Sequence, residues 1–331
     1  MALTLEMLET YCDKSKLKAY NSSHEVFVFD GVDRYHSEGI SRQFLSDAGV
    51  YHERYFKPGR FAMLLERAFE SAGFPIDSCQ DLSVLDLGSG SGNTVIPVVG
   101  RNRSLKLVAT DLSIDLLLIL ASLVRHKEYR DQIGFVCADA NRKIFNEGAF
   151  DLVVGAYILH HLIEPARTVT NALSYLKPGG VAVFFEPFEY GCNLMKTLYL
   201  LVLDDSRAQK DLPPAVIAHF KSIIRDYNAR FDVENVKPFT KDLDDKWLFT
   251  QRFFADLCRQ ADCRMLGIRN NKEGVLERAF TEQMFENLKL SGLDCHPLPR
   301  WLLELCEEFD QHLDVSLKRR LVLDGTVIIR K

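Results

Sequence analysis

Val84-Leu85-Asp86-Leu87-Gly88-Ser89-Gly90-Ser91-Gly92-Asn93 is an apolar run that leads into three glycines alternating with small polar residues. Glycine has no Cβ and tolerates positive φ, so a turn of this composition lets the backbone approach a ligand closely. The residues that follow are compatible with a helix, and the unpaired N–H groups of a helix start would face the same place. We therefore interpret this stretch as a strand, a ligand-binding turn and the start of a helix.

Further apolar runs follow at regular intervals, and they are continuous rather than alternating, as is typical of strands covered on both faces. The predicted strands are Ser83–Leu87, Lys106–Thr110, Ile133–Cys137, Phe150–Gly155 and Val181–Glu186. Helical segments separate them, notably at 113–126 and 165–176. This alternation predicts an α/β fold with a doubly wound, mostly parallel sheet. We also expect strands near 26–29 and 264–269, and a final strand at the end of the chain.

The alternation of predicted strands and helices divides the chain into three parts. Residues 1–80 are predicted to form an N-terminal helical cap, and residues 81–187 together with 251–331 the core that carries the sheet. Residues 188–250 are helical in tendency and break the alternation. We expect them to form a helical lid inserted over the carboxyl ends of the strands.

The composition of the chain bears on whether it binds nucleic acid, metal or a membrane. The 331 residues include 41 Lys and Arg against 46 Asp and Glu, a net charge of −5, which gives no sign of the basic face of a nucleic-acid-binding protein. The eight cysteines form no Cys-x-x-Cys pair, so no metal site is predicted. The first residues do not resemble a signal peptide and no apolar run is long enough for a membrane span, so we expect a cytoplasmic protein. No oligomeric state is predicted.

Five motifs occur together in a recognisable order: the glycine turn, Asp111 and Asp139 after two strands, His160-His161 after the fourth strand, and the segment 176–180. Together they resemble the class I S-adenosylmethionine-dependent methyltransferases, most closely the branch of quinone-biosynthesis and other small-molecule enzymes. The resemblance covers residues 82–187. It implies a seven-stranded, Rossmann-like sheet, with S-adenosylmethionine as cofactor and S-adenosylhomocysteine as product.

The resemblance assigns the cofactor-binding residues. In this interpretation Asp111 accepts the ribose hydroxyls, Asp139 accepts the adenine amino group, and Asp86 orients the turn or meets the ammonium group. The alternatives are that Asp111 caps the next helix and that Asp139 caps a turn. The full set predicted to bind the cofactor is Asp86, Gly88, Ser89, Gly90, Gly92, Asn93, Asp111, Leu112, Asp139, Ala140 and Ala156.

Candidate catalytic residues follow the fourth and fifth strands. A hydroxyl acceptor needs a base, and His160, His161 and Glu186 stand where the strands of an open α/β sheet form their ligand crevice. The alternative for each histidine is a purely structural role in the loop. Aromatic residues are predicted to exclude water or to line the acceptor site, the alternative being ordinary core packing. They are Tyr51, His52, Tyr55, Tyr157 and Tyr190.

These features predict a methyltransferase that acts on a small molecule, a biosynthetic intermediate, with oxygen as the methylated atom. A nicotinamide-dependent oxidoreductase is an alternative, but its fingerprint is Gly-x-Gly-x-x-Gly, whereas Gly88, Gly90 and Gly92 are spaced Gly-x-Gly-x-Gly. A methyltransferase that acts on protein or nucleic acid would share the same motifs, and so would a catalytically silent relative of the fold.

Overall fold

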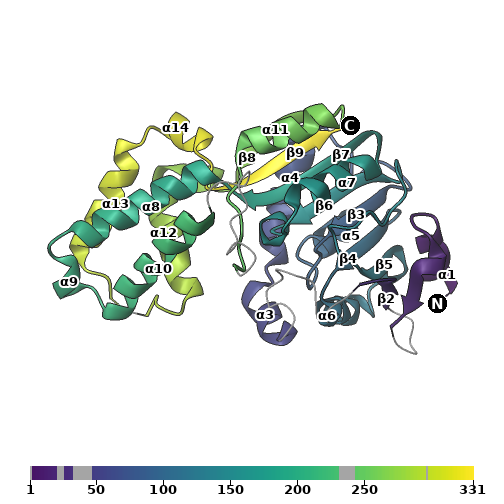
Figure 1. The fold of residues 1–331 in the computed structure, drawn as a ribbon, viewed down its shortest axis with the longest axis horizontal. Helices are drawn as coiled ribbons and strands as arrows, with labels where there is room; N and C mark the ends of the chain where they lie inside the picture. The colour runs from purple at the N-terminus through teal and green to yellow at the C-terminus, as the bar shows by residue number, and fades with distance from the viewer. Residues whose placement is uncertain (1, 21–25, 33–46, 231–242, 296) are drawn as a thin grey trace.

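The computed structural model describes residues 2–20, 26–32, 47–230, 243–295 and 297–331 (Figure 1). Its strands are β1 (Leu17–Ala19), β2 (Val26–Phe29), β3 (Ser83–Leu87), β4 (Lys106–Asp111), β5 (Ile133–Cys137), β6 (Phe150–Ala156), β7 (Leu176–Pro187), β8 (Arg264–Asn270) and β9 (Asp324–Arg330). In the described part of the chain they form one sheet in the order β1-β2-β5-β4-β3-β6-β7-β9-β8. The six strands from β2 to β7 run parallel, and β1, β8 and β9 pair antiparallel.

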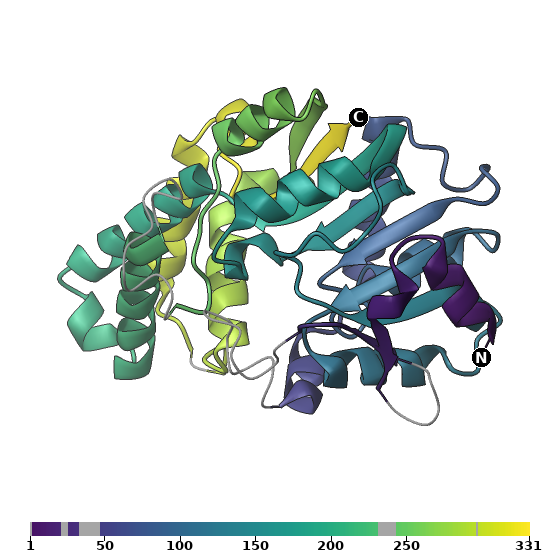
Figure 2. The same cartoon turned by 45° about the vertical axis from the view of Figure 1, so that its right-hand side comes forward.

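Helices cover both faces of this sheet (Figures 1 and 2). One face packs against α4 (Pro58–Ala72), α5 (Val95–Arg101) and α6 (Ile114–Val124). The other face packs against α1 (Ala2–Glu9), α7 (Pro165–Tyr175) and α11 (Gln251–Gln260). Because side chains alternate across a strand, the continuous apolar runs of the sequence supply both cores at once. The predicted α/β class and doubly wound sheet are therefore confirmed.

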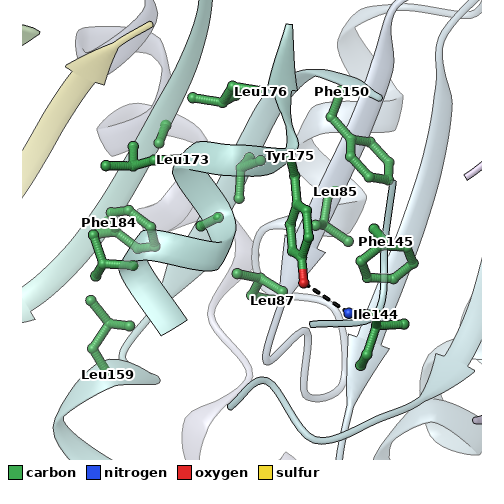
Figure 3. Packing of buried hydrophobic residues seen from close by; sticks show 14 of the residues in the cluster. Leu85, Leu87, Ile144, Phe145, Phe150, Leu159, Leu173, Tyr175, Leu176 and Phe184 are labelled. Carbon is green, nitrogen blue, oxygen red and sulfur yellow. Dashed lines mark hydrogen bonds between the residues drawn. The ribbon is translucent and has the colours of Figure 1, made fainter. Parts of the chain in front are cut away.

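One core contains a buried tyrosine whose hydroxyl is satisfied by backbone (Figure 3). Tyr175 is 2% exposed, and its hydroxyl oxygen accepts the N–H of Ile144 at 2.9 Å. Its ring meets Phe145 edge to face, with centroids 5.6 Å apart. A buried hydroxyl needs such a partner, so the contact holds the loop between β5 and β6 onto α7.

The sheet has nine strands rather than the seven that the family resemblance implied. The additional strands, β1 and β2, come from the segment predicted to be a helical cap. The parallel pairing of β2 with β5 places Val26 beside Phe135, and the side chains of Val26, Phe27 and Phe29 are buried. Burial of this apolar strand extends the sheet past the edge that β5 would otherwise form.

Further helices pack together at one end of the sheet (Figure 1). They are α8 (Glu189–Asp204), α9 (Ala208–Asp211), α10 (Pro214–Arg230), α12 (Ala279–Leu290) and α13 (Arg300–His312), which we call the helical cluster. Helices α8 to α10 come from the predicted lid, of which residues 231–242 lie outside the described ranges. Helices α12 and α13 come from the stretch expected in the core; their apolar faces instead pack on those of α8 and α10.

No helix in the described ranges combines the length and apolarity that crossing a membrane would require.

The glycine turn lies where the chain reverses its direction across the sheet. The chain passes from β3 to β4 and β5, then returns to β6 on the other side of β3. In open α/β sheets ligands bind at this position. Gly88 has φ +68°, and a Cβ there would lie 2.6 Å from Ile158 Cδ1, so only glycine fits.

The first prediction concerns the junction between the helical cluster and the sheet. A Cβ on Gly191, in the first turn of α8, would overlap backbone atoms of Val322 and Leu323. Gly191→Ala should therefore lower the free energy of unfolding by about 1–3 kcal/mol, the usual cost of overpacking. Gly100→Ala is the matched control, because a Cβ there meets nothing within 4 Å. Chemical denaturation of both variants tests this, and equal stabilities would contradict it.

Candidate active site

Two adjacent cavities open at the carboxyl ends of the parallel strands. The small cavity measures about 110 Å³ and the large one about 790 Å³. The small cavity lies over β4, β5 and the glycine turn, and the large cavity lies between the sheet and the helical cluster. The residues that line both are Tyr51, Gly88, Gly90, Ala156, Tyr157 and His161.

Asp111 is the fixed carboxylate of the small cavity. Its Oδ2 accepts the N–H of Gly90 at 2.8 Å, and its Oδ1 accepts the N–H of Ser113 at 2.8 Å. Burial raises the pKa of this carboxyl. Ser113, not Asp111, is the N-cap of α6, so the capping alternative does not describe this structure. A carboxylate oxygen can accept two hydrogen bonds, which leaves Asp111 capacity for ligand hydroxyls.

Asp86 lies beneath the glycine turn and is 1% exposed. Its Oδ2 accepts the hydroxyl of Thr94 at 2.5 Å, whereas its Oδ1 has no hydrogen-bond partner among the described residues. Burial raises the pKa of Asp86 to about 7. An unpartnered buried oxygen is costly, and a cationic or hydrogen-bond-donating ligand would remove that cost. Asp86 lines neither cavity, so the contact with the ammonium group that the resemblance implies stays a prediction.

The remaining predicted cofactor residues fall into two groups. Leu112, Asp139 and Ala140 line the small cavity, and Ser89 and Asn93 line the large one. Asp139 Oδ1 also accepts the backbone N–H of Asn141 at 2.9 Å, so it caps a turn as well as facing the cavity. Gly92 lines neither cavity, and a Cβ there would overlap the side chain of Leu120.

Helix α3 (Ala48–Tyr55) and the residues that follow it are held over the glycine turn by three polar contacts. His52 Nδ1 lies 2.8 Å from Ser91 Oγ. Asn93 donates from Nδ2 to the carbonyl of Tyr55 at 3.0 Å and accepts the N–H of Lys57 at 2.7 Å. Tyr51 and Tyr55 are thereby placed at the large cavity. Tyr190 is not brought to the site: it is 52% exposed on α8 and lines neither cavity.

Glu186 holds the loop that carries the two histidines. It is fully buried at the end of β7, and its Oε1 accepts the N–H groups of Ile158 at 3.1 Å and Leu159 at 2.7 Å. Its Oε2 lies 2.6 Å from His160 Nδ1. Glu186 lines neither cavity, so it acts as a positioning residue for His160.

The two histidines have opposite electrostatic surroundings. Burial disfavours the charged form of His160, but Glu186 and Asp245 outweigh it and raise the pKa to about 9. Burial, and then the neighbouring His160, lower the pKa of His161 to about 3. Asp245 Oδ1 lies 3.5 Å from His160 Nε2 and 3.3 Å from His161 Nδ1. The geometry thus favours a charged His160 beside a neutral His161.

Tyr157 belongs to a second polar group at the large cavity. Its backbone has φ +53°, and its hydroxyl donates to Asp324 Oδ2 at 2.6 Å. Arg60 donates to the same oxygen at 2.8 Å. Burial, and then Asp324, hold the pKa of Tyr157 well above its ordinary value, so the phenol remains a donor.

Several charged residues of the large cavity were not predicted from the sequence, namely Arg60, Asp226, Arg230, Asp245 and Asp324. Arg230 is almost fully buried and donates from Nη1 to Asp226 Oδ2 at 3.0 Å. The same nitrogen forms an ion pair with Asp245 Oδ2 at 3.3 Å. These residues come from α4, α10, the segment before α11, and β9, and no local motif marks them. A charge in a periodic helical pattern reads as solvent-facing, so only the fold reveals its burial.

Comparison with known proteins agrees with this geometry. Residues 84–180 match the model of a family described as a methyltransferase domain. Over 145 residues the chain is 31% identical to the tRNA N(3)-methylcytidine methyltransferase Mettl2 of Drosophila melanogaster, covering 41% of this chain and 44% of that protein. Over 121 residues it is 31% identical to the demethylmenaquinone methyltransferase of Renibacterium salmoninarum, covering 36% and 48%.

A third similarity is to the hybrid PKS-NRPS synthetase fsa1 of a Fusarium species, 28% identical over 34% of this chain and 3% of that protein. The chain therefore spans less than half the length of each of these relatives. The segment that matches the family model carries the glycine turn, Asp111 and the His160-His161 pair.

The second prediction follows from Asp86. Its pKa of about 7 lies above the ordinary value of 3.8, so between these values the folded protein keeps a proton that the unfolded chain has released. The free energy of unfolding should therefore fall as the pH rises through this window. Asp86→Asn, which cannot ionise, should show a smaller fall. Denaturant unfolding at about pH 5 and about pH 8 measures the difference, and an unchanged slope in the variant would contradict the assignment.

Proposed function

Because residues 84–180 match a methyltransferase domain, we propose that this protein transfers the methyl group of S-adenosylmethionine to a hydroxyl group of a small organic acceptor. The observation that carries the proposal is the boundary between the two cavities. A donor in the small cavity and an acceptor in the large one would meet at the six residues they share, Ala156, Tyr157 and His161 among them. Holding two reactants at such a boundary supplies much of the catalysis in a bimolecular transfer.

The proposed cofactor site uses residues around the small cavity. Bound S-adenosylmethionine would supply an electrophilic methyl group on a sulfonium. Asp111 would accept its ribose hydroxyls, and Asp139 its adenine amino group. Asp86 would receive the ammonium on its unpartnered oxygen. Tyr51, held in place by the contacts of α3, would help to exclude water from the boundary.

The large cavity supports a small acceptor. Its volume of about 790 Å³ is within the range of small-molecule sites, roughly 300–1,000 Å³. The net charge of −5 disfavours a polyanionic acceptor, which weighs against an RNA substrate despite the similarity to a tRNA methyltransferase. The similarity to a demethylmenaquinone methyltransferase supports a biosynthetic intermediate as the acceptor.

A hydroxyl acceptor must lose its proton as the methyl group arrives. The His160–His161 pair lies beside the large cavity, and His161 also borders the small one, so we place proton removal at this pair. Glu186 contributes by holding His160 and the loop. Helices α8 and α10, from the predicted lid, would cover the acceptor, since Cys192, Tyr227 and Arg230 line its cavity.

The third prediction tests the cofactor. Asp111→Ala removes the acceptor of the ribose hydroxyls and should weaken binding of S-adenosylhomocysteine by about 1–3 kcal/mol. Asp115→Ala is the matched control, because Asp115 is exposed in the first turn of the adjacent helix. Calorimetric titration measures both affinities. Equal affinities in the two variants, or tighter binding of a nicotinamide dinucleotide, would overturn the proposal.

The fourth prediction tests the division of roles around the histidines. Replacing the group that takes the proton should lower kcat by about 10²–10⁴-fold and leave cofactor affinity intact. His160→Ala and His161→Ala identify that group, and Glu186→Gln should lower kcat through His160 with little change in KM. Glu164→Gln, exposed in the same loop, is the control. Near-normal turnover in all three variants would show that no base is used.

A further inference from the structure

Two imidazoles and a carboxylate converge at the edge of the large cavity. One nitrogen from each of His160 and His161 and one oxygen of Asp245 lie within 4.8 Å of one another. The histidines belong to the 3-10 turn Leu159–His161, and Asp245 belongs to the segment that precedes α11. Two histidines and one carboxylate are a donor set that zinc and other divalent first-row metals bind in proteins.

The separations of these donors resemble those of ligands around one ion. Asp245 Oδ1 is 3.5 Å from His160 Nε2 and 3.3 Å from His161 Nδ1. Hydrogen bonds between such groups are shorter, about 2.7–3.2 Å. Two ligands about 2.1 Å from a tetrahedral metal lie about 3.4 Å apart. The two separations that involve Asp245 thus match the spacing around a shared ion, and the two histidine nitrogens lie within 4.8 Å of each other.

The surroundings hold these donors in position. Glu186 Oε2, 2.6 Å from His160 Nδ1, fixes the ring so that Nε2 faces Asp245. Metal-bound histidines commonly carry such a carboxylate on the other nitrogen. Arg230 lies 3.3 Å from Asp245 Oδ2, the oxygen that does not face the histidines. His161 Nδ1 donates a hydrogen bond to the carbonyl oxygen of Asp244 at 2.9 Å, so this nitrogen must give up its proton when a metal binds.

A metal ion would replace a proton at this cluster. While His160 is charged, the carboxylates of Glu186, Asp226 and Asp245 are matched by the cationic groups of His160, Arg230 and Lys246, and binding of a metal would release the proton of His160. We propose that His160, His161 and Asp245 form a binding site for one divalent transition-metal ion, with its remaining coordination positions facing the large cavity. The ion and a proton would compete for the same imidazole nitrogens, so proton removal by this pair belongs to the metal-free protein. The proposal concerns the site alone; a role in orienting the acceptor's oxygen would rest on the proposed function.

The fifth prediction is that the full-length protein, stripped with a chelator, binds one equivalent of Zn²⁺. Calorimetric titration and equilibrium dialysis with metal analysis measure the stoichiometry. His161→Ala and Asp245→Asn should each weaken binding by at least about tenfold, since each removes a ligand. Co²⁺ offers a readout independent of activity, because its visible absorption in the wild type should be lost in both variants. Circular dichroism establishes that the variants are folded.

His312→Ala is the control for histidine at the surface, because His312 lies on α13 away from both cavities. It should bind Zn²⁺ as the wild type does. The proposal fails if the wild type shows no saturable binding, in which case a proton rather than a metal joins these groups. It also fails if both ligand variants keep wild-type affinity. Titration with S-adenosylhomocysteine on the same preparations tests the proposed function separately, so the two failures can be told apart.

Discussion

The arrangement of the active site depends on one buried carboxylate. Glu186 ends the parallel strand β7 with no exposed surface, and it is satisfied by two backbone N–H groups and one imidazole. A buried carboxylate without partners would be very costly, so the turn after β6 must present those donors. The same requirement fixes where His160 and His161 stand. Strands β6 and β7, which are neighbours in the sheet, are thereby joined at their carboxyl ends.

The features that could be predicted from the sequence are those that residues close together in the chain determine. The apolar runs predicted the parallel strands because both faces of each strand are covered, and the glycine spacing predicted the turn after β3 because its backbone needs positive φ at Gly88. Strand β2 was also visible as an apolar run, but its place in the sheet was not. Pairing with β5 is a long-range choice that burial of Val26 and Phe27 decides.

The acceptor side of the site could not be predicted for the same reason. Arg60 reads as an ordinary charge in a helix and Asp324 as an ordinary turn residue, yet they meet at one oxygen across 264 positions of the chain. Arg230 and Asp245 are brought together by the packing of α10 beside the segment that precedes α11. Both pairs line the large cavity, and each joins separate elements of the chain, so neither pair exists before the chain has folded. Residues Asp86 and Asp111, in contrast, lie on consecutive strands of a single repeating motif.

The helical cluster is built from two separate stretches of the chain that leave the sheet at neighbouring strands, after β7 and between β8 and β9. The parallel strands that carry the glycine turn and Asp111 lie outside both stretches. Mutations that reshape the cluster can therefore accumulate without altering the residues around the small cavity. Such a separation allows the two halves of the site to evolve at different rates. The residues that contact the acceptor can change while those that bind the methyl donor stay the same. For protein engineering, the two stretches form a pair that would have to be exchanged together, because each supplies half of one apolar core.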